Sequence, residues 1–152
     1  MRIVIDADGC PVVRIAVDCA KRRGVEAVIV CDSAHYFDIE GVATITVMKG
    51  ADSADFRIVN MLSPGDIVVT QDYGLAAMSL ARNTRVVNQN GMIYHEGNID
   101  SLLLSRHTAR KIRNAGGRLK GPPKRTREQD IAFLETLNRL IDELLPTGET
   151  NG

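Results

Sequence analysis

Short apolar runs alternate along the chain with segments that repeat apolar residues at helical spacing. Four runs rich in β-branched residues are strand candidates: residues 3–5, 25–30, 42–47 and 66–70. The first of them does not alternate with polar positions, which is typical of a strand buried on both faces of a parallel sheet. Four segments are helix candidates: residues 12–22, 51–62, 75–82 and 99–115. The pattern predicts an α/β fold with a mostly parallel central sheet flanked by helices.

Three local signals refine these boundaries. Pro11 fits the first position of a helix, where its missing N–H group has no consequence. Asn90-Gly91 lies between two short apolar runs and predicts a β-hairpin after the fifth strand, because this pair supplies the positive φ angles of a tight turn. Thr126 and Gln129 have the spacing of a capping box, which predicts a last helix over residues 126–145.

The composition places the chain in a broad class. A length of 152 residues corresponds to about one domain with a real core. No apolar stretch has the length of a membrane span, so we expect no signal peptide and no membrane partner. Three cysteines without a C-x-x-C motif favour a reducing, cytoplasmic location over a disulfide framework or a zinc site.

The formal net charge of zero hides a strong segregation of charge. Residues 101–127 hold nine Lys or Arg and no Asp or Glu, whereas residues 1–100 hold nine basic and thirteen acidic residues. A block of this kind gains affinity for polyanions by releasing counterions, so we expect it to bind nucleic acid, single-stranded RNA in particular. The alternative is a solvated helix face followed by a flexible loop. The candidate phosphate-binding residues are Arg106, Arg110, Arg113, Arg118, Lys120, Lys124 and Arg125.

Acidic residues occur at predicted strand ends or helix starts in three separate parts of the chain: Asp6 and Asp8, Asp52 and Asp55, and Asp72. In open α/β sheets these positions meet at the edge where ligands bind. Carboxylates gathered there would repel one another, and a bound divalent cation removes that repulsion. Oxygen-only ligands favour Mg²⁺ or Mn²⁺, which support displacement at phosphorus. The structural alternative is that single acids only cap helices or offset helix dipoles.

Four motifs together resemble the YaiI/YqxD family of bacterial proteins. They are Asp6-Ala7-Asp8-x-Cys10-Pro11-Val12, Gly50-Ala51-Asp52-Ser53-Ala54-Asp55, Val69-Thr70-Gln71-Asp72-Tyr73-Gly74-Leu75-Ala76 and Gly121-Pro122-Pro123. The likeness covers nearly the whole chain. That family is grouped with PIN-like domains, which are metal-dependent nucleases. The resemblance implies a single PIN-like domain over residues 1–146, with a basic helix and loop at 101–127 and a flexible tail at 147–152.

The PIN resemblance also implies roles for particular residues. Asp6 matches the acid that ends the first strand, and Asp72 matches the acid of a strand-T-x-D-x-x-L-A element in which Thr70 has an orienting role. Asp55 or Asp52 takes the place of a helical acid, which is usually Glu in that superfamily. The implied catalytic residues are Asp6, Asp55, Asp72 and Thr70, and the implied ligands of Mg²⁺ or Mn²⁺ are Asp6, Asp52, Asp55 and Asp72. Asp8 is not a general feature of PIN domains, and we add it to the catalytic candidates as an auxiliary ligand or base.

The opening stretch also resembles haloacid-dehalogenase-type phosphatases. In that interpretation Asp6 is the nucleophile and Asp8 the general acid, and a phosphorylated Asp6 would support it. Those enzymes place Thr or Ser shortly after the second acid, where this chain has Cys10-Pro11. We therefore expect a nuclease first and a phosphatase second.

A third interpretation is a nucleic-acid-binding protein without catalysis. It predicts that binding survives the loss of Asp6 and Asp72 and falls when Arg110, Arg113 and Lys124 are neutralised. The nuclease interpretation predicts that turnover disappears with the two acids while binding persists. A homodimer is compatible with the sequence in either case.

Overall fold

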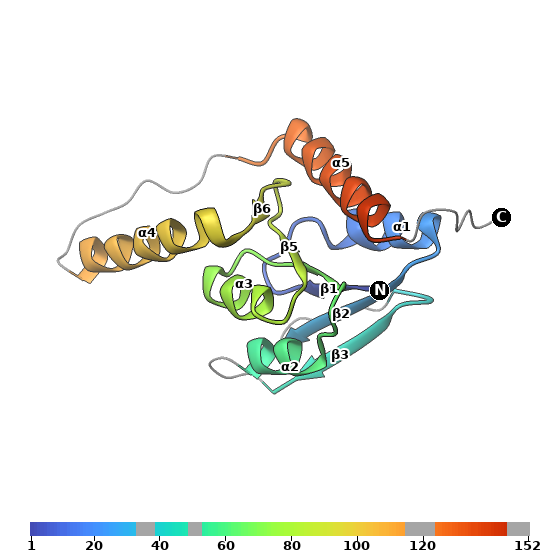
Figure 1. Ribbon diagram of the computed structural model, residues 1–152, viewed down its shortest axis with the longest axis horizontal. Helices are drawn as coiled ribbons and strands as arrows, with labels where there is room; N and C mark the ends of the chain where they lie inside the picture. The colour runs from blue at the N-terminus through green and yellow to red at the C-terminus, as the bar shows by residue number, and fades with distance from the viewer. Residues whose placement is uncertain (33–38, 49–52, 115–123, 146–152) are drawn as a thin grey trace.

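The computed structural model of the chain describes residues 1–32, 39–48, 53–114 and 124–145, with only the backbone described at 53 and 106–114 (Figure 1). The strands are β1 (Arg2–Asp6), β2 (Glu26–Asp32), β3 (Ala43–Val47), β4 (Ile67–Val69), β5 (Arg85–Val87) and β6 (Ile93–Tyr94). The helices are α1 (Val13–Arg23), α2 (Ser53–Met61), α3 (Tyr73–Leu80), α4 (Glu96–Asn114) and α5 (Arg127–Leu144).

These strands form one sheet of six in the order β3-β2-β1-β4-β5-β6. The pairs β1–β2, β1–β4, β2–β3 and β4–β5 are parallel, and β5–β6 is antiparallel. The predicted α/β class, the mostly parallel sheet and the hairpin are therefore confirmed. The chain leaves β1 toward β2 and leaves β4 toward β5, so the strand order reverses between β1 and β4. In folds of this kind ligands bind at that reversal.

Both faces of β1 are buried, which explains its uninterrupted apolar run. Ile3 and Ile5 belong to the cluster that includes residues of α1 and α5, whereas Val4 belongs to the cluster on the opposite face. All three side chains are 0% exposed. Full burial of one such side chain contributes about 1.5–3 kcal/mol. The apolar pattern thus fixes β1 at the centre of the fold.

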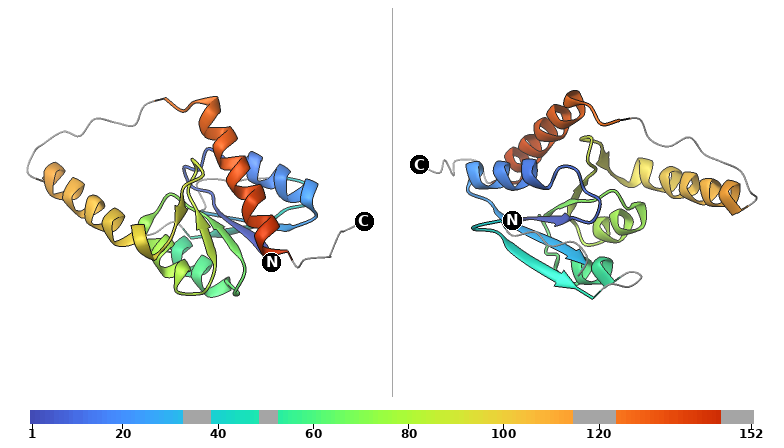
Figure 2. Two further views of the ribbon diagram at one scale, coloured as in Figure 1. Left: turned by 45° about the horizontal axis from the view of Figure 1, so that its top comes forward. Right: turned by 180° about the vertical axis from the view of Figure 1, so that it is seen from behind.

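The helices cover the sheet in two layers (Figures 1 and 2). Helices α1 and α5 pack on one face, where Ala16 and Phe133 reach the core. Helices α2 and α3 pack on the other face through Ile58 and Leu75, and the start of α4 joins them through Ile99. Helix α4 then extends away from the sheet. None of the helices in the described ranges is long and apolar enough to cross a membrane.

The start of α1 differs from the prediction at Pro11. The helix begins at Val13 with Val12 as its N-cap, so Pro11 precedes the helix instead of opening it. The reason is the turn after β1, in which Cys10 donates its backbone N–H to the carbonyl oxygen of Ala7 at 3.0 Å. That turn delays the helix by two residues.

The hairpin also differs in detail. Gly91 has a φ of +86°, but Asn90 does not have a positive φ, so the positive φ expected at both residues is found at Gly91 alone. The backbone N–H of Asn88 donates to the Met92 carbonyl oxygen at 2.9 Å, which closes a loop of three residues. A loop of this length takes its single positive φ at the last position. The predicted capping box at Thr126 and Gln129, by contrast, is confirmed.

Helix α5 touches the hairpin at Gly91, and this contact generates a test of the packing. A Cβ added at Gly91 would lie 2.6 Å from the backbone oxygen of Ala132 and 2.9 Å from Oγ1 of Thr136. At Gly65 the φ is almost the same, +87°, but a Cβ would meet nothing within 4 Å. The two glycines share the backbone strain and differ only in the steric clash.

We expect Gly91→Ala to lower the free energy of unfolding by about 3 kcal/mol, the sum of backbone strain and overpacking. Gly65→Ala is the matched control, and its free energy of unfolding should fall by only about 1 kcal/mol, from the backbone strain alone. Urea denaturation followed by circular dichroism measures both. Equal losses in the two variants would contradict the close packing of the hairpin on α5.

Candidate functional site

The ends of β1 and β4 place two polar side chains next to each other. Asp6 is the last residue of β1, and Thr70 follows the last residue of β4, its parallel neighbour. The Thr70 hydroxyl donates to Oδ2 of Asp6 at 2.8 Å, and it accepts the backbone N–H of Asp72 at 3.0 Å. Thr70 is 1% exposed, so this geometry is held by the core. One hydroxyl thus links Asp6 to the segment that carries Asp72.

Asp72 is the N-cap of α3, where its Oδ1 accepts the backbone N–H of Leu75 at 3.0 Å. A capping role therefore accounts for part of this residue's hydrogen bonding. The N-cap of α1, in contrast, is Val12 and has no side-chain cap, so neither Asp6 nor Asp8 caps that helix. Helix capping therefore explains Asp72 in part and does not account for Asp6 or Asp8.

Asp55 and Asp8 reach the site from two other segments. Asp55 lies in the first turn of α2, which packs on β1 and β2. Asp8 follows β1, and both of its carboxylate oxygens accept the backbone N–H of Asp32, at 3.2 and 3.1 Å. This contact ties the turn after β1 to the end of β2. Asp52 lies outside the described residues.

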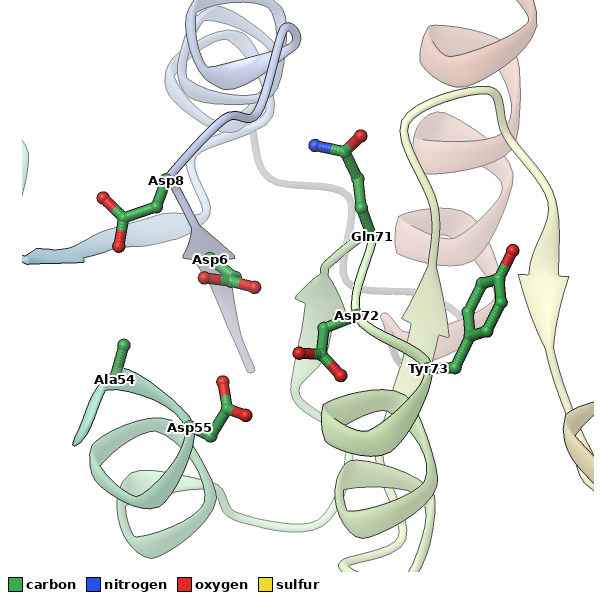
Figure 3. A pocket seen from close by; sticks show the side chains of 7 residues that line it. All are labelled: Asp6, Asp8, Ala54, Asp55, Gln71, Asp72 and Tyr73. Carbon is green, nitrogen blue, oxygen red and sulfur yellow. The ribbon is translucent and has the colours of Figure 1, made fainter. Parts of the chain in front are cut away.

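The four acids line one cavity with a volume of about 530 Å³. Figure 3 shows the carboxylates of Asp55 and Asp72 directed toward that of Asp6. The cavity is lined by Asp6, Asp8, Ala54, Asp55, Gln71, Asp72 and Tyr73. Among the described residues that line the cavity, four are acids and none is Lys or Arg.

Burial is the main reason why the Asp6 carboxyl has an unusual proton affinity. It raises the pKa from an ordinary 3.8 to about 6, against the lowering effect of the Thr70 hydrogen bond. The charges of Asp55, Asp72 and Asp8 raise the pKa further. A buried acid with a raised pKa in a cleft is a candidate functional group.

The donor set fits Mg²⁺ or Mn²⁺ in an open site. Within the described ranges, no three His, Cys, Asp or Glu side chains form a ready cluster around one point. Mg²⁺ does not require such a cluster, because it keeps several water ligands and is usually held by one or two carboxylates. Asp6 and Asp72, linked through Thr70, can supply these, with Asp55 facing them. A closed protein cage of the kind that holds structural zinc does not fit.

Comparison with known proteins places this chain in a family. A protein-family sequence model described as "Uncharacterized BCR, YaiI/YqxD family" matches residues 4–143 of the chain. The chain belongs to the YaiI/YqxD family. The expectation from the sequence motifs is thus confirmed.

Bacterial relatives of this YaiI/YqxD protein are similar over nearly their whole length. A "UPF0178 protein" of Exiguobacterium sibiricum is 53% identical over 143 residues, which cover 94% of this chain and 98% of the relative. Another "UPF0178 protein", from Ruminiclostridium cellulolyticum, is 47% identical over 137 residues, 90% of each chain. No solved structure was found to match. These names carry no activity, so the function has to be argued from the site.

Besides Tyr73, two residues of the cavity were not among the site residues predicted from the sequence. Gln71 lies between Thr70 and Asp72, and its Nε2 donates to the Gly9 carbonyl oxygen at 2.9 Å, which joins the loops after β4 and β1. Ala54 precedes Asp55 on α2. The position of Gln71 beside two predicted site residues at a strand end was a usable signal. Ala54 carries no chemical signal of its own.

The structure describes the candidate phosphate-binding residues to different extents. Arg106, Arg110 and Arg113 lie on α4, at positions where only the backbone is described, and Arg118 and Lys120 lie outside the described residues. Lys124 is exposed before α5.

Arg125 makes contacts within the protein. Its Nε donates to Asp130 at 2.7 Å, one terminal nitrogen donates to Oδ1 of Asn90 at 2.7 Å, and the other donates to the Gln89 carbonyl oxygen at 2.6 Å. The residue thus fixes the hairpin loop to the start of α5. Its role in the structure is to join these two elements.

The raised pKa of Asp6 predicts a particular stability profile in metal-free buffer. Because the folded state binds the proton more tightly than the unfolded state, stability falls as the pH rises from about 4 through 6. The difference between 3.8 and about 6 corresponds to about 3 kcal/mol at pH 7. Asp6→Asn removes the titration and can still accept the Thr70 hydrogen bond. The free energy of unfolding of Asp6→Asn at pH 7 should therefore be up to about 3 kcal/mol higher than that of the wild type.

The stability gained by Asp6→Asn relative to the wild type should shrink toward zero at pH 3.5, as measured by urea denaturation at each pH. Asp18→Asn, at an exposed position of α1, is the matched control and should change stability by less than about 0.5 kcal/mol at both pH values. A loss of stability in Asp6→Asn at pH 7, or a gain that does not depend on pH, would contradict the electrostatic description.

Proposed function

We propose that this protein is a divalent-metal-dependent nuclease that hydrolyses phosphodiester bonds in RNA. The observation that carries the proposal is the cavity at the reversal of the strand order, where the carboxylates of Asp8, Asp55 and Asp72 line the same cavity as the partly buried Asp6. Charge of this density disfavours an empty site at neutral pH, and a divalent cation offsets it. The resemblance to PIN-like domains points to the same chemistry.

In the proposed mechanism Asp6 and Asp72 hold the cation, and Thr70 keeps their positions fixed through its two hydrogen bonds. When bound, a divalent cation activates water and stabilises the charge that develops at phosphorus. Asp55 completes the negative wall from the α2 side of the cavity. Asp8 borders the same cavity, and we assign it the auxiliary role of accepting a proton from the attacking water.

The substrate class in this proposal follows from the charge distribution. The nine basic residues of 101–127 belong to α4, the segment after it and the start of α5. Basic segments without acidic neighbours bind the phosphate backbone without reading sequence. Helix α4 packs against α3, whose N-cap is the site residue Asp72, and its later part carries Arg106, Arg110 and Arg113. A nucleic acid fits this combination better than a small phosphoester.

The test is cleavage of labelled single-stranded RNA and DNA by purified protein with Mn²⁺, with Mg²⁺ or with EDTA. We expect metal-dependent cleavage of RNA that falls by at least about 100-fold in Asp6→Asn and in Asp72→Asn, because a direct ligand matters at least as much as an outer-shell partner. Asp18→Asn is the matched control for an Asp-to-Asn change outside the cavity and should cut at the wild-type rate.

Different failures of this experiment have different meanings. Cleavage that is equal in the wild type and both cavity variants would show that the activity comes from a contaminant, and the proposal would fall. Binding of RNA without cleavage under any metal condition would favour the non-catalytic alternative. Trapping of phosphate on Asp6 with a small phosphoester would favour the phosphatase alternative.

A further inference from the structure

One aromatic side chain lines the same cavity as the four acids. Tyr73 directly follows Asp72, is the first residue of α3 and is half-buried. Figure 3 shows its ring on the far side of Asp72 from Asp6, pointing away from the carboxylates. The ring therefore lies outside the set of acids, next to Asp72.

The ring is held in place by a chain of contacts that leads back to the acid site. Tyr73 and Tyr94 form an edge-to-face pair, with ring centroids 6.1 Å apart and an interplanar angle of 64°. Tyr94 is 1% exposed, and its hydroxyl donates to the backbone carbonyl oxygen of Thr70 at 3.2 Å. Because Thr70 also donates to Asp6, the Tyr73 ring and the Asp6 carboxylate are fixed relative to each other.

Tyr73 lines the cavity and is half-buried, so its side chain is partly accessible to solvent. A partly accessible aromatic ring next to the proposed phosphate site has the properties of a stacking surface for a base. We propose that Tyr73 is the platform on which one unpaired base of the substrate stacks, beside the phosphate held at the acid site. This inference rests on the proposed nuclease function and adds the form of its substrate.

A base can lie flat on a side chain only after it has left its neighbours in a duplex. The platform therefore predicts that the protein cuts single strands and spares duplexes. Every base has a π face, so stacking on Tyr73 tolerates any sequence.

The experiment combines base removal in the substrate with substitution in the protein. Single-stranded RNA oligonucleotides carry one abasic site at each successive position around the mapped cleavage point, and kcat/KM is measured for the wild type, Tyr73→Leu and Tyr73→Phe. We expect one position at which base removal lowers kcat/KM of the wild type by about 5- to 150-fold. On intact RNA the kcat/KM of Tyr73→Leu should be lower than that of the wild type by a similar factor. Removing the base at that position should lower the kcat/KM of Tyr73→Leu no further. Tyr73→Phe, the matched control, keeps the ring and should resemble the wild type.

The coupling between the two changes separates stacking from a purely structural role, since Tyr73 also packs against the second apolar cluster. If the factors by which Tyr73→Leu and base removal lower kcat/KM multiply at every position, the two changes act independently and the proposal is wrong. An equal loss in Tyr73→Phe and Tyr73→Leu would overturn it too, because the hydroxyl would then be the active group. Should Tyr73→Leu not fold, a wild-type scan without any sensitive position overturns the proposal by itself.

Different results would contradict the nuclease function and the stacking role of Tyr73. If the wild type cuts RNA in a metal-dependent manner but no abasic position matters, only the role of Tyr73 is wrong. If the wild type cuts no RNA at all, the nuclease function and the role of Tyr73 are both wrong.

Discussion

The hydrogen bond from Thr70 to Asp6 joins the ends of β1 and β4 at the centre of the sheet, and the geometry of the acid site depends on it. The same hydroxyl accepts the backbone N–H of Asp72, so a single buried side chain sets the relation between two acids from distant parts of the sequence. Burial opposes the charge on Asp6, and the neighbouring acids oppose it further. The protein thus keeps an arrangement that lowers its own stability at neutral pH. Such arrangements are typical of functional sites, where stability is given up for chemistry.

The fold supplies this geometry through its strand order. Parallel strands direct their carboxyl ends to one edge, and the reversal between β1 and β4 opens a space there that α2 and α3 flank. Asp55 and Asp72 lie at or next to the starts of these two helices, so both helices contribute an acid at the same level as the strand ends. The face of the sheet covered by α1 and α5 has a different role: its contacts, including Thr136 with Gly91, hold the hairpin in place.

The part of the site that the sequence predicted is the part encoded locally. Asp6 and Asp72 could be found because each lies at or shortly after the end of an apolar run, and the ends of parallel strands are known to converge. The hairpin at Asn90 was predicted, but not the position of its single positive φ angle at Gly91, since the loop length depends on the register of the two strands. The contacts of Gln71 with Gly9 and of Arg125 with the hairpin join residues that are far apart in the chain. No local pattern carries information of that kind.

We expect a divalent cation to bind at Asp6 and to displace its proton, and calorimetric titration of Mn²⁺ into the protein at pH 6 measures both the binding and the proton release. Titrations in two buffers with different ionisation enthalpies give the number of protons released on binding. Asp6 is about half protonated at this pH, so the account predicts saturable binding with release of about half a proton. The release should disappear at pH 8. Absence of saturable binding, or binding without proton release at pH 6, would contradict the account.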